Sequence, residues 1–408
     1  MDRFDVYFDG DHIGILDVEG RDLSFRYNRE LMDSTDAIPI SRSLPWRDEP
    51  FNDAECGPFF RGLLPEDQYR RSVAASLQIS EENTAGLFSA IGGECAGAVS
   101  LWPFGQRPGG FSYQPIGACE IRDMILEGRA AGLAGQSRLS LAGAHAKFAL
   151  RKTIDGGWEL PLSGAPSTHI VKVPDKEFAD LASNEFFCMR LARSAGLDAA
   201  PVELIEFEGV PVLIIERYDR NATGGSISRI HQEDFCQATG IEPSNKYEAE
   251  GGPSLADLTR VLVDESSNPI ADVKQLIRWT GFNFIVGNCD AHGKNGSMIY
   301  ASDSVRLAPF YDIVSTWVYR GLSRKQAMQI GGEYRQEYIE TRHWERLATD
   351  IGRPFKFVCG ELLALVESTR QHLEAENGEV HSDPDTDTIV QVRSLVEERL
   401  ERLAGVGG

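Results

Sequence analysis

Two aspartates and an asparagine lie close together in one stretch of this 408-residue chain. Asp290 precedes Asn295 by five residues, and Asp312 follows in the short sequence FYD. Phosphoryl transfer needs a carboxylate that accepts a hydroxyl proton and oxygen ligands that hold Mg²⁺ against ATP. We therefore interpret Asp290 as a candidate base, and Asn295 and Asp312 as candidate metal ligands. The alternative is that Asp290 and Asn295 are turn residues, since Asx side chains are common in loops.

The elements around these residues would bring them together. Apolar residues recur with a helical period over Val273–Gly287, and the pattern stops at Gly287-Asn288, so Asp290 opens a loop. Two strand-like runs at 297–300 and 305–309 follow, joined by four residues. The pattern predicts a hairpin that returns Asp312 to the side of Asn295.

Two upstream segments have the residues that bind phosphate. Ser140–Lys147 reads SLAGAHAK, and its small residues would let backbone N–H groups approach phosphates, although a tight turn would need small residues as well. Lys172 interrupts the apolar strand 168–173, where a charge needs a partner. A phosphate is one candidate, with Glu185 of the next helix as the ion-pair partner. The alternative is a lysine on the solvent face.

The segment Glu216-Arg217-Tyr218 ends the last strand before the helical half of the chain. Adenine docks against such a segment through backbone hydrogen bonds, with apolar cover that Tyr218 would supply. His292 and Lys294 share the loop of Asp290, so they are candidates for contact with phosphate oxygens, although a lone histidine is often structural.

Periodicity divides the chain into a β-rich first half and a helical second half. Strands are expected at 3–8, 12–18 and 23–27, a linker near 105–118, and a hairpin of 201–207 with 210–216. A helix capped by Ser183 and stopped by Gly196 is expected at 183–194, and Glu242–Pro253 is expected to be an exposed loop. Further helices are expected at 232–239, 255–264, 273–287, 344–351, 355–376 and 388–403.

The composition is that of a globular chain with an acidic excess. Its 408 residues are enough for two or three domains, and its 42% hydrophobic content is ordinary for a globular protein. No apolar run reaches the roughly 20 residues that span a bilayer, and the N-terminus has no signal-peptide pattern, so we expect a cytoplasmic protein without membrane contact. The net charge of −21 argues against nucleic-acid binding through the overall field and favours a basic partner. Seven cysteines without a C-x-x-C pair indicate reduced thiols: Cys56, Cys95, Cys119, Cys188, Cys236, Cys289 and Cys359.

Taken in order, these segments resemble the HipA-like serine/threonine kinases, which are toxins of bacterial toxin–antitoxin pairs. The matching segments are FFRGLLPE, SLAGAHAKFAL, STHIVKVP, NEFFCMRLARSAGL, LIIERYDR, HQEDFCQATG, KYEAEGGP, NCDAHGKN and PFYDIVS, and they cover nearly the whole chain. The resemblance implies an α+β, two-lobed protein-kinase-like fold with a β-rich N-lobe, an all-helical C-lobe and an additional N-terminal β-rich subdomain. The expected domains are 1–110, 111–220 and 221–408.

The resemblance also implies a function and a set of site residues. Asp290 would be the catalytic base, and Asn295 and Asp312 would bind Mg²⁺. Ser140 would be autophosphorylated, which expels the phosphate loop and silences the enzyme. A helix-turn-helix antitoxin (HipB-like) would neutralise the toxin and mediate contact with operator DNA, and the substrate would belong to translation, as an aminoacyl-tRNA synthetase does. The implied ATP contacts are Ala142, Gly143, Ala144, His145, Ala146, Lys147, Lys172, Glu216, Arg217, Tyr218, His292, Gly293, Lys294, Asn295, Tyr311 and Asp312.

The chain departs from the usual family text, AGAQDK and DAHAKN, at His145-Ala146 and at Gly293. Loss of an acidic residue at Ala146 leaves Lys147 without a near neighbour of opposite charge, and Gly293 loosens the loop. These changes bear on rate more than on reaction type. Two other functions remain open at this point. One is a kinase-fold binding module that acts mainly as the co-repressor of an antitoxin, and the other is a small-molecule kinase.

Overall fold

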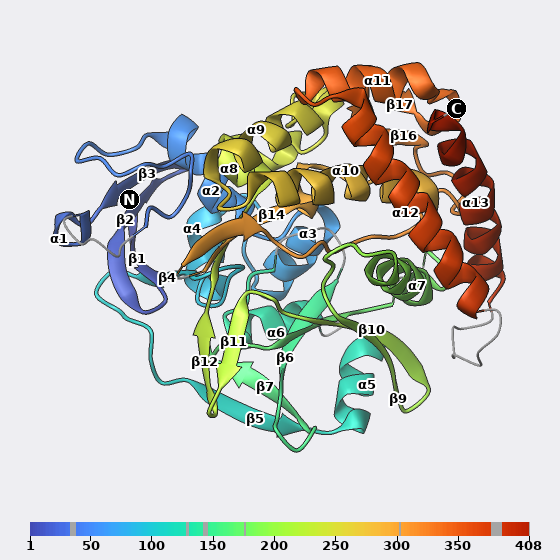
Figure 1. Cartoon of the computed structure of the whole chain (residues 1–408). Coiled ribbons are helices and arrows are strands. Elements are labelled where there is room, and N and C mark those ends of the chain that lie inside the picture. Colours follow the sequence, from blue (N-terminus) through green and yellow to red (C-terminus); the bar gives the residue numbers. More distant parts are fainter. Residues whose placement is uncertain are drawn as a thin grey trace. The chain divides into compact units, whose positions relative to one another are not determined.

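The computed structural model describes residues 1–32, 38–127, 130–141, 146–174, 177–301, 303–376 and 386–407 (Figure 1). The chain forms two compact units. Unit 1 contains Met1–Pro174, Ile205–Ser244 and Ile299–Ala301, and unit 2 contains Asp175–Leu204, Asn245–Met298 and Ser302–Gly408. The predicted division into three domains stays a prediction.

Unit 1 begins with a four-stranded antiparallel sheet in the order β3-β2-β1-β4. The strands are β1 (Asp2–Phe8), β2 (Asp11–Glu19), β3 (Asp22–Tyr27) and β4 (Val99–Pro103), so the three predicted N-terminal strands are confirmed. Alternation along them buries one apolar face, which packs in a common core with residues of three helices. Those helices are α2 (Asp53–Gly62), α3 (Asp67–Ser76) and α4 (Thr84–Ile91), and the short α1 is Arg29–Met32.

The second sheet has six strands in the order β5-β7-β6-β8-β10-β9. They are β5 (Ser112–Ile116), β6 (Lys147–Lys152), β7 (Trp158–Leu162), β8 (His169–Lys172), β9 (Val202–Phe207) and β10 (Val210–Glu216). The predicted β9–β10 hairpin is confirmed. The linker expected at 105–118 is wrong in part, because β5 pairs with β7. Pro115 lowers the strand signal, but an edge strand tolerates proline. The helices α5 (Ala118–Leu126) and α6 (Ala130–Ser137) each contribute residues to the core beside this sheet.

The remaining elements of unit 1 are short. The strands β11 (Arg220–Thr223) and β12 (Ser226–Arg229) form a hairpin, followed by β13 (His231–Asp234) and α8 (Phe235–Thr239). The helix predicted over 232–239 is therefore too long at its start. Asp234 accepts a hydrogen bond from the backbone of Gln237, whose side chain bonds back to Asp234 N–H, and this capping box begins the helix at Phe235.

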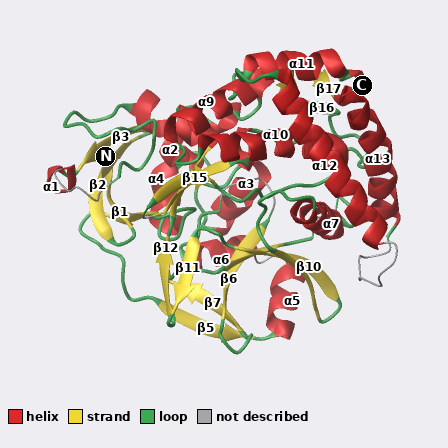
Figure 2. Cartoon of the chain, in the orientation of Figure 1, coloured by secondary structure: helices red, strands yellow, loops and turns green. Residues whose placement is uncertain are grey.

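Unit 2 is mainly helical (Figure 2). Its helices are α7 (Leu181–Ser194), α9 (Leu255–Glu265), α10 (Pro269–Val286), α11 (Thr341–Asp350), α12 (Phe355–Glu376) and α13 (Asp387–Ala404). The hairpin strands are β14 (Ser297–Ala301), of which only Ser297 and Met298 belong to unit 2, with β15 (Ser304–Leu307), and β16 (Lys325–Ile330) with β17 (Glu333–Arg335). Helix α10 is buried over most of its surface and packs against α9, α12 and α13, so it forms the centre of this unit.

Two predicted helix starts in unit 2 are corrected, together with one predicted loop that begins in unit 1. Helix α7 begins at Leu181 after Asp180, and Ser183 is a buried helical residue rather than the cap. Helix α10 begins at Pro269, four residues earlier than predicted, because Asn268 caps it and proline suits the first helical position. The segment 242–253 is not a fully exposed loop. It contains short 3₁₀ turns at Pro243–Asn245 and Glu248–Glu250, and Lys246 is buried.

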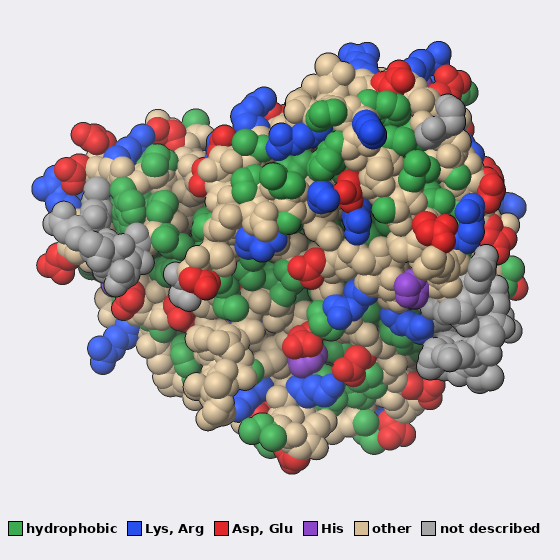
Figure 3. Space-filling model, in the orientation of Figure 1, with side chains coloured by type: hydrophobic (Ala, Val, Ile, Leu, Met, Phe, Trp, Pro, Cys, Tyr) green, Lys and Arg blue, Asp and Glu red, His purple; other side chains and the backbone are tan. Residues whose placement is uncertain are grey.

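No helix among the described residues combines the length and the apolar character that crossing a bilayer requires. On the face drawn in Figure 3, Lys and Arg side chains lie among Asp and Glu side chains. The net charge of −21 is therefore not gathered into one acidic patch among the described residues of that face.

Candidate active site

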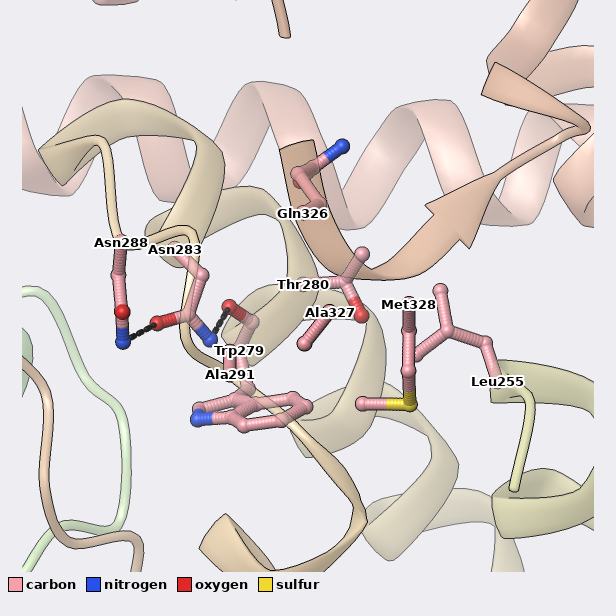
Figure 4. A pocket seen from close by; sticks show the side chains of 9 residues that line it. All are labelled: Leu255, Trp279, Thr280, Asn283, Asn288, Ala291, Gln326, Ala327 and Met328. Carbon is pink, nitrogen blue, oxygen red and sulfur yellow. Dashed lines mark hydrogen bonds between the residues drawn. The ribbon is translucent and has the colours of Figure 1, made fainter. Parts of the chain in front are cut away.

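The loop that carries Asp290 is fastened to the end of helix α10. Gly287 ends the helix with φ +69, and a Cβ there would lie 2.7 Å from both Leu395 Cδ2 and Trp317 Cβ, so only glycine fits. Asn288 then donates to Asn283 Oδ1 at 2.9 Å, and its own Oδ1 accepts the Asp290 N–H at 3.0 Å. Figure 4 shows the Asn288–Asn283 pair. The buried helix therefore sets the backbone position of Asp290.

Hydrogen bonds within the loop join Asp290 to Asn295. The Asp290 carbonyl accepts the His292 N–H at 2.9 Å and the Asn295 Nδ2–H at 3.2 Å. His292 is buried, and its Nδ1 accepts the Lys294 N–H at 3.3 Å. These bonds make 290–295 one compact turn ending in the 3₁₀ segment Gly293–Asn295. Because Asn295 uses its amide nitrogen for the loop, its Oδ1 is the atom left for a metal ion.

The Asp290 carboxylate has one fixed oxygen. Tyr247 Oη donates to Oδ1 at 2.6 Å, and the Tyr247 ring meets the His292 ring edge-on with centroids 5.3 Å apart. No residue in the described part of the chain donates a hydrogen bond to Oδ2, and Asp290 is only half-buried. Sequence reasoning did not assign Tyr247 to the site. Tyr247 belongs to the KYEAEGGP segment, but no spacing rule connects residue 247 with residue 290.

The predicted hairpin is confirmed as β14 with β15, and the segment that follows returns to the turn 290–295. Tyr311 Oη donates to the Lys294 carbonyl at 2.7 Å and lies 2.8 Å from Ser297 Oγ. Asp312 follows Tyr311 directly and has a left-handed backbone, with φ +60, which aspartate adopts more readily than most residues. The Tyr311–Lys294 bond therefore holds the residue before Asp312 against the residue before Asn295.

The donor set at Asn295 and Asp312 fits a magnesium ion that also binds phosphate. Mg²⁺ is usually held by one or two carboxylates, substrate phosphates and water rather than by a cage of protein ligands. Among the described residues, no group of three or more His, Cys, Asp or Glu side chains is placed to hold a metal. One carboxylate and one amide oxygen are thus a suitable partial set, which phosphate oxygens would complete.

In unit 1, two of the predicted ATP contacts are cross-strand partners. Lys147 of β6 lies directly opposite Lys172 of β8 in the antiparallel register, so both side chains leave the same face of the sheet. The next pair, Phe148 and Val171, is buried in the core on the other face. Like charges placed directly opposite are destabilising in a sheet unless opposite charge offsets them. The register therefore brings two of the predicted ATP contacts onto one face of the sheet, and Lys147 has a neighbouring cation that the sequence did not reveal.

Ser140 is inside the protein. It is fully buried, its Oγ donates to the Leu63 carbonyl at 2.6 Å, and its N–H donates to the Glu94 carbonyl at 2.8 Å. Kinase chemistry at this hydroxyl therefore requires the residue to leave this position. The predicted phosphate contacts Ala142, Gly143, Ala144 and His145 lie outside the described residues. Ala146 accepts the Val173 N–H at 3.0 Å at the start of β6.

Arg217 contributes its side chain to a buried ion cluster. This arginine cluster consists of Arg217, Arg220 and Arg229 with Glu94 and Asp219, all in unit 1. Burial by itself would raise the pKa of Glu94, but the three guanidinium groups outweigh it and lower that pKa to about 2. Arg217 could therefore contact ATP only through its backbone. No local pattern points to Glu94, which lies more than a hundred residues before its arginine partners.

The other two hinge residues differ in exposure. Glu216 is exposed at the end of β10, opposite His169 of β8, whereas Tyr218 is half-buried and donates its hydroxyl hydrogen bond to Gln232. Glu185 is buried in α7 of unit 2, and Lys172 belongs to unit 1. Their ion pair stays a prediction.

A small cavity lies beside the loop that carries Asp290 (Figure 4). Its volume is about 20 Å³, which is room for about one water molecule, so a nucleotide does not bind inside it. The lining residues come from the loop, from helices α9 and α10 and from β16: Leu255, Trp279, Thr280, Asn283, Asn288, Ala291, Gln326, Ala327 and Met328.

An aspartate that has one carboxylate oxygen held by a tyrosine, in a compact turn that also holds an asparagine, is compatible with the class of phosphotransferases. Two family models give the narrower assignment. The HipA N-terminal domain matches residues 4–102, and the HipA-like C-terminal domain matches residues 139–376. The chain belongs to the HipA family of serine/threonine kinase toxins.

Individual relatives agree with this assignment. The chain is 41% identical over 379 residues to the putative kinase Y4mE of Sinorhizobium fredii, covering 90% of each chain. It is 30% identical over 351 residues to the serine/threonine-protein kinase toxin HipA of Shewanella oneidensis, covering 82% of this chain and 80% of that one. The structure matches HipA from the solved Shewanella oneidensis complex of HipA, HipB and operator DNA, with a TM-score of 0.83, 26% identity and coverage of 99% and 96%. The protein is thus a serine/threonine kinase with the protein-kinase-like fold of HipA.

Proposed function

We propose that this kinase uses ATP and Mg²⁺ to phosphorylate serine or threonine hydroxyls of a protein of translation, such as an aminoacyl-tRNA synthetase, and its own Ser140. The observation that carries the proposal is the Asp290 carboxylate, of which Tyr247 holds one oxygen while the other has no donor among the described residues. A carboxylate in this state is suited to accept the proton of an incoming hydroxyl group.

Each remaining residue has a role in this proposal. Bound ATP would supply the phosphoryl group, and Mg²⁺ would neutralise its charge. Asn295 Oδ1 and the Asp312 carboxylate would hold the metal, and the paired Lys147 and Lys172 would bind phosphate oxygens. Glu216, Arg217 and Tyr218 would face adenine, with Arg217 contributing only backbone atoms because its side chain is in the arginine cluster. His292, Gly293, Lys294 and Tyr311 complete the proposed ATP contacts.

Burial of Ser140 gives self-phosphorylation a regulatory consequence. In the described state its hydroxyl group donates to a backbone carbonyl and has no exposure to water. A phosphoserine carries up to two negative charges and could not return to a site lined by carbonyl oxygens without a large desolvation cost. Phosphorylation would therefore keep Ser140 outside its unphosphorylated position and reduce ATP binding.

We also propose that a HipB-like, DNA-binding antitoxin neutralises this chain. The structural relative was solved with HipB and operator DNA, which supports a partner of this kind. The net charge of −21 favours a basic protein partner and argues against strong direct contact with DNA. DNA would thus be reached mainly through the antitoxin.

Intact mass before and after incubation with Mg²⁺ and ATP tests the proposal. We expect wild type to gain one phosphate, mapped to Ser140 by peptide mass. Asp290→Asn, which keeps the size of the side chain and removes the base, should gain none, and Ser140→Ala should gain none while still hydrolysing ATP. Labelling of Ser140 in Asp290→Asn would refute the role of Asp290. Wild type that binds ATP without consuming it would instead favour the binding-module function.

A further inference from the structure

We propose that Tyr247 is a positioning residue for phosphoryl transfer, which holds Asp290 Oδ1 so that Oδ2 faces the acceptor hydroxyl. The segment Asn245–Gly252, here the Tyr247 loop, keeps the tyrosine in place. This inference rests on the proposed function, because it assigns a role in the reaction for which Asp290 is the base.

Tyr247 forms a short hydrogen bond to Asp290, and a second contact holds the tyrosine ring. The Oη–Oδ1 distance of 2.6 Å lies in the range for a hydroxyl group that donates to a carboxylate. The edge-on contact of the Tyr247 ring with His292 restricts rotation of the ring. Since His292 N–H also binds the Asp290 carbonyl, Tyr247 contacts the catalytic turn at two places. The carboxylate is thus held by a side chain 43 residues earlier in the chain.

The Tyr247 loop is closed tightly on itself. Gly252 N–H donates to the Tyr247 carbonyl at 2.9 Å, and a Cβ at residue 252 would lie 2.4 Å from the Asn245 carbonyl oxygen. Only glycine allows that approach. The Lys246 carbonyl also accepts the Gly293 N–H at 3.3 Å, which connects the backbone of the loop to the catalytic turn.

Glu248 fastens the same loop to strand β16. Its Oε2 accepts the Gln329 N–H at 2.7 Å and its Oε1 accepts the Gln329 side-chain amide at 2.5 Å. Both carboxylate oxygens are thus used by one residue of the strand. Burial is the main cause that raises the pKa of Glu248, so this carboxylate is desolvated as an internal anchor would be. The loop is therefore supported on both sides of Tyr247.

A different role for the same contact predicts the opposite effect of mutation. If the tyrosine hydroxyl occupied the position of the acceptor hydroxyl, it would block the base, and its removal would speed up transfer. The open Oδ2 argues for positioning, because a second acceptor site remains on the carboxylate while Tyr247 is bound. The two roles are distinguished by the sign of the change in rate.

The test compares full-length wild type with Tyr247→Phe and with Tyr338→Phe as a matched control. Tyr338 is 51% exposed and lies outside the proposed site. The rates of self-labelling and of ATP hydrolysis are measured over a series of ATP concentrations, and affinity is measured with a fluorescent ATP analogue. We expect Tyr247→Phe to lower the maximal rate about 10- to 100-fold, the size typical of a misplaced catalytic group. The ATP concentration that gives half the maximal rate and the affinity for the ATP analogue should not change. The control variant should match wild type.

Two further variants separate positioning from a general loss of structure. In an Asp290→Asn background, Tyr247→Phe should not lower the residual rate of ATP hydrolysis further, because the tyrosine acts only through the Asp290 carboxylate. Glu248→Gln, which offers one oxygen to two donors, should lower the maximal rate in the same direction as Tyr247→Phe.

An unchanged or increased rate in Tyr247→Phe would overturn the inference, as would equal losses in both backgrounds. Wild type that transfers no phosphate would instead refute the proposed function, so the two failures are distinguishable.

Discussion

Replacement of Glu94 by glutamine should destabilise unit 1 strongly. Glu94 is fully buried, and its two oxygens accept hydrogen bonds or form ion pairs with Arg217, Arg220 and Arg229. Glutamine keeps the size of the side chain but removes the negative charge. Three buried guanidinium groups would then face Asp219 as the one remaining acid of the arginine cluster.

The size of the effect follows from two independent estimates. The pKa of Glu94 falls from its ordinary 4.5 to about 2 in the folded protein. Since one pKa unit corresponds to about 1.4 kcal/mol, the charged form contributes about 3 kcal/mol to the free energy of unfolding. Removal of one partner from a buried ion pair costs about 3–5 kcal/mol in measured proteins. We therefore expect a loss of about 3–5 kcal/mol at pH 7.

The dependence on pH provides a second check with a defined sign. A carboxylate whose folded pKa is lowered stabilises the protein fully above its unfolded pKa of about 4.5, and the stabilisation is lost as pH falls towards about 2. The difference in stability between wild type and Glu94→Gln should thus shrink as pH falls below 4.5. The titrating groups outside the arginine cluster have the same surroundings in both proteins, so they cancel in this difference.

Urea denaturation followed by tryptophan fluorescence measures both quantities. Glu82→Gln is the control, because Glu82 forms an ion pair on the surface, where its side chain is 64% exposed. That change should cost less than about 1 kcal/mol. A loss of similar size in both variants, or a Glu94→Gln loss that does not shrink below pH 4.5, would refute the electrostatic account of the cluster.

Three further predictions concern the Tyr247 loop, the cysteine thiols and the strand lysine Lys172. Gly252→Ala should lower the stability of unit 2 by about 1–3 kcal/mol in urea denaturation and reduce the rate of phosphoryl transfer, because the new Cβ would lie 2.4 Å from a carbonyl oxygen. Gly360→Ala is the control and should be neutral, because a Cβ there meets no atom within 4 Å. In the native protein a thiol reagent should modify the exposed Cys119 first and leave Cys95 unmodified, because burial raises the pKa of the Cys95 thiol to about 12. Cys119→Ser should remove the fast phase of modification, and persistence of that phase would contradict the prediction. Lys172→Met should reduce the ATP-dependent rise in melting temperature, since it removes one of two opposed cations at the proposed phosphate site; an unchanged response to ATP would argue against that site.

The sequence by itself determined the elements that depend on near neighbours. The end of α10 at Gly287, the turn from Asp290 to Asn295 and the hairpin that returns Tyr311 and Asp312 are all encoded within a few tens of residues. Their periodicity and turn chemistry operate over short distances, so the loop that carries Asp290 could be predicted from them. The resemblance to HipA-like kinases, confirmed by the family models, added the order of the remaining parts.

The tertiary structure alone decided which distant side chains meet. Tyr247 donates a hydrogen bond to Asp290, and Glu94 forms ion pairs with three arginines that follow residue 216. Lys147 lies opposite Lys172. No local pattern encodes such pairs, because strand register and core packing set them after the elements have formed. For the same reason Arg217, which was expected at the nucleotide through its place in the sequence, has its side chain in a buried ion cluster. Local sequence therefore specified the reacting groups, and long-range packing specified what holds them in position.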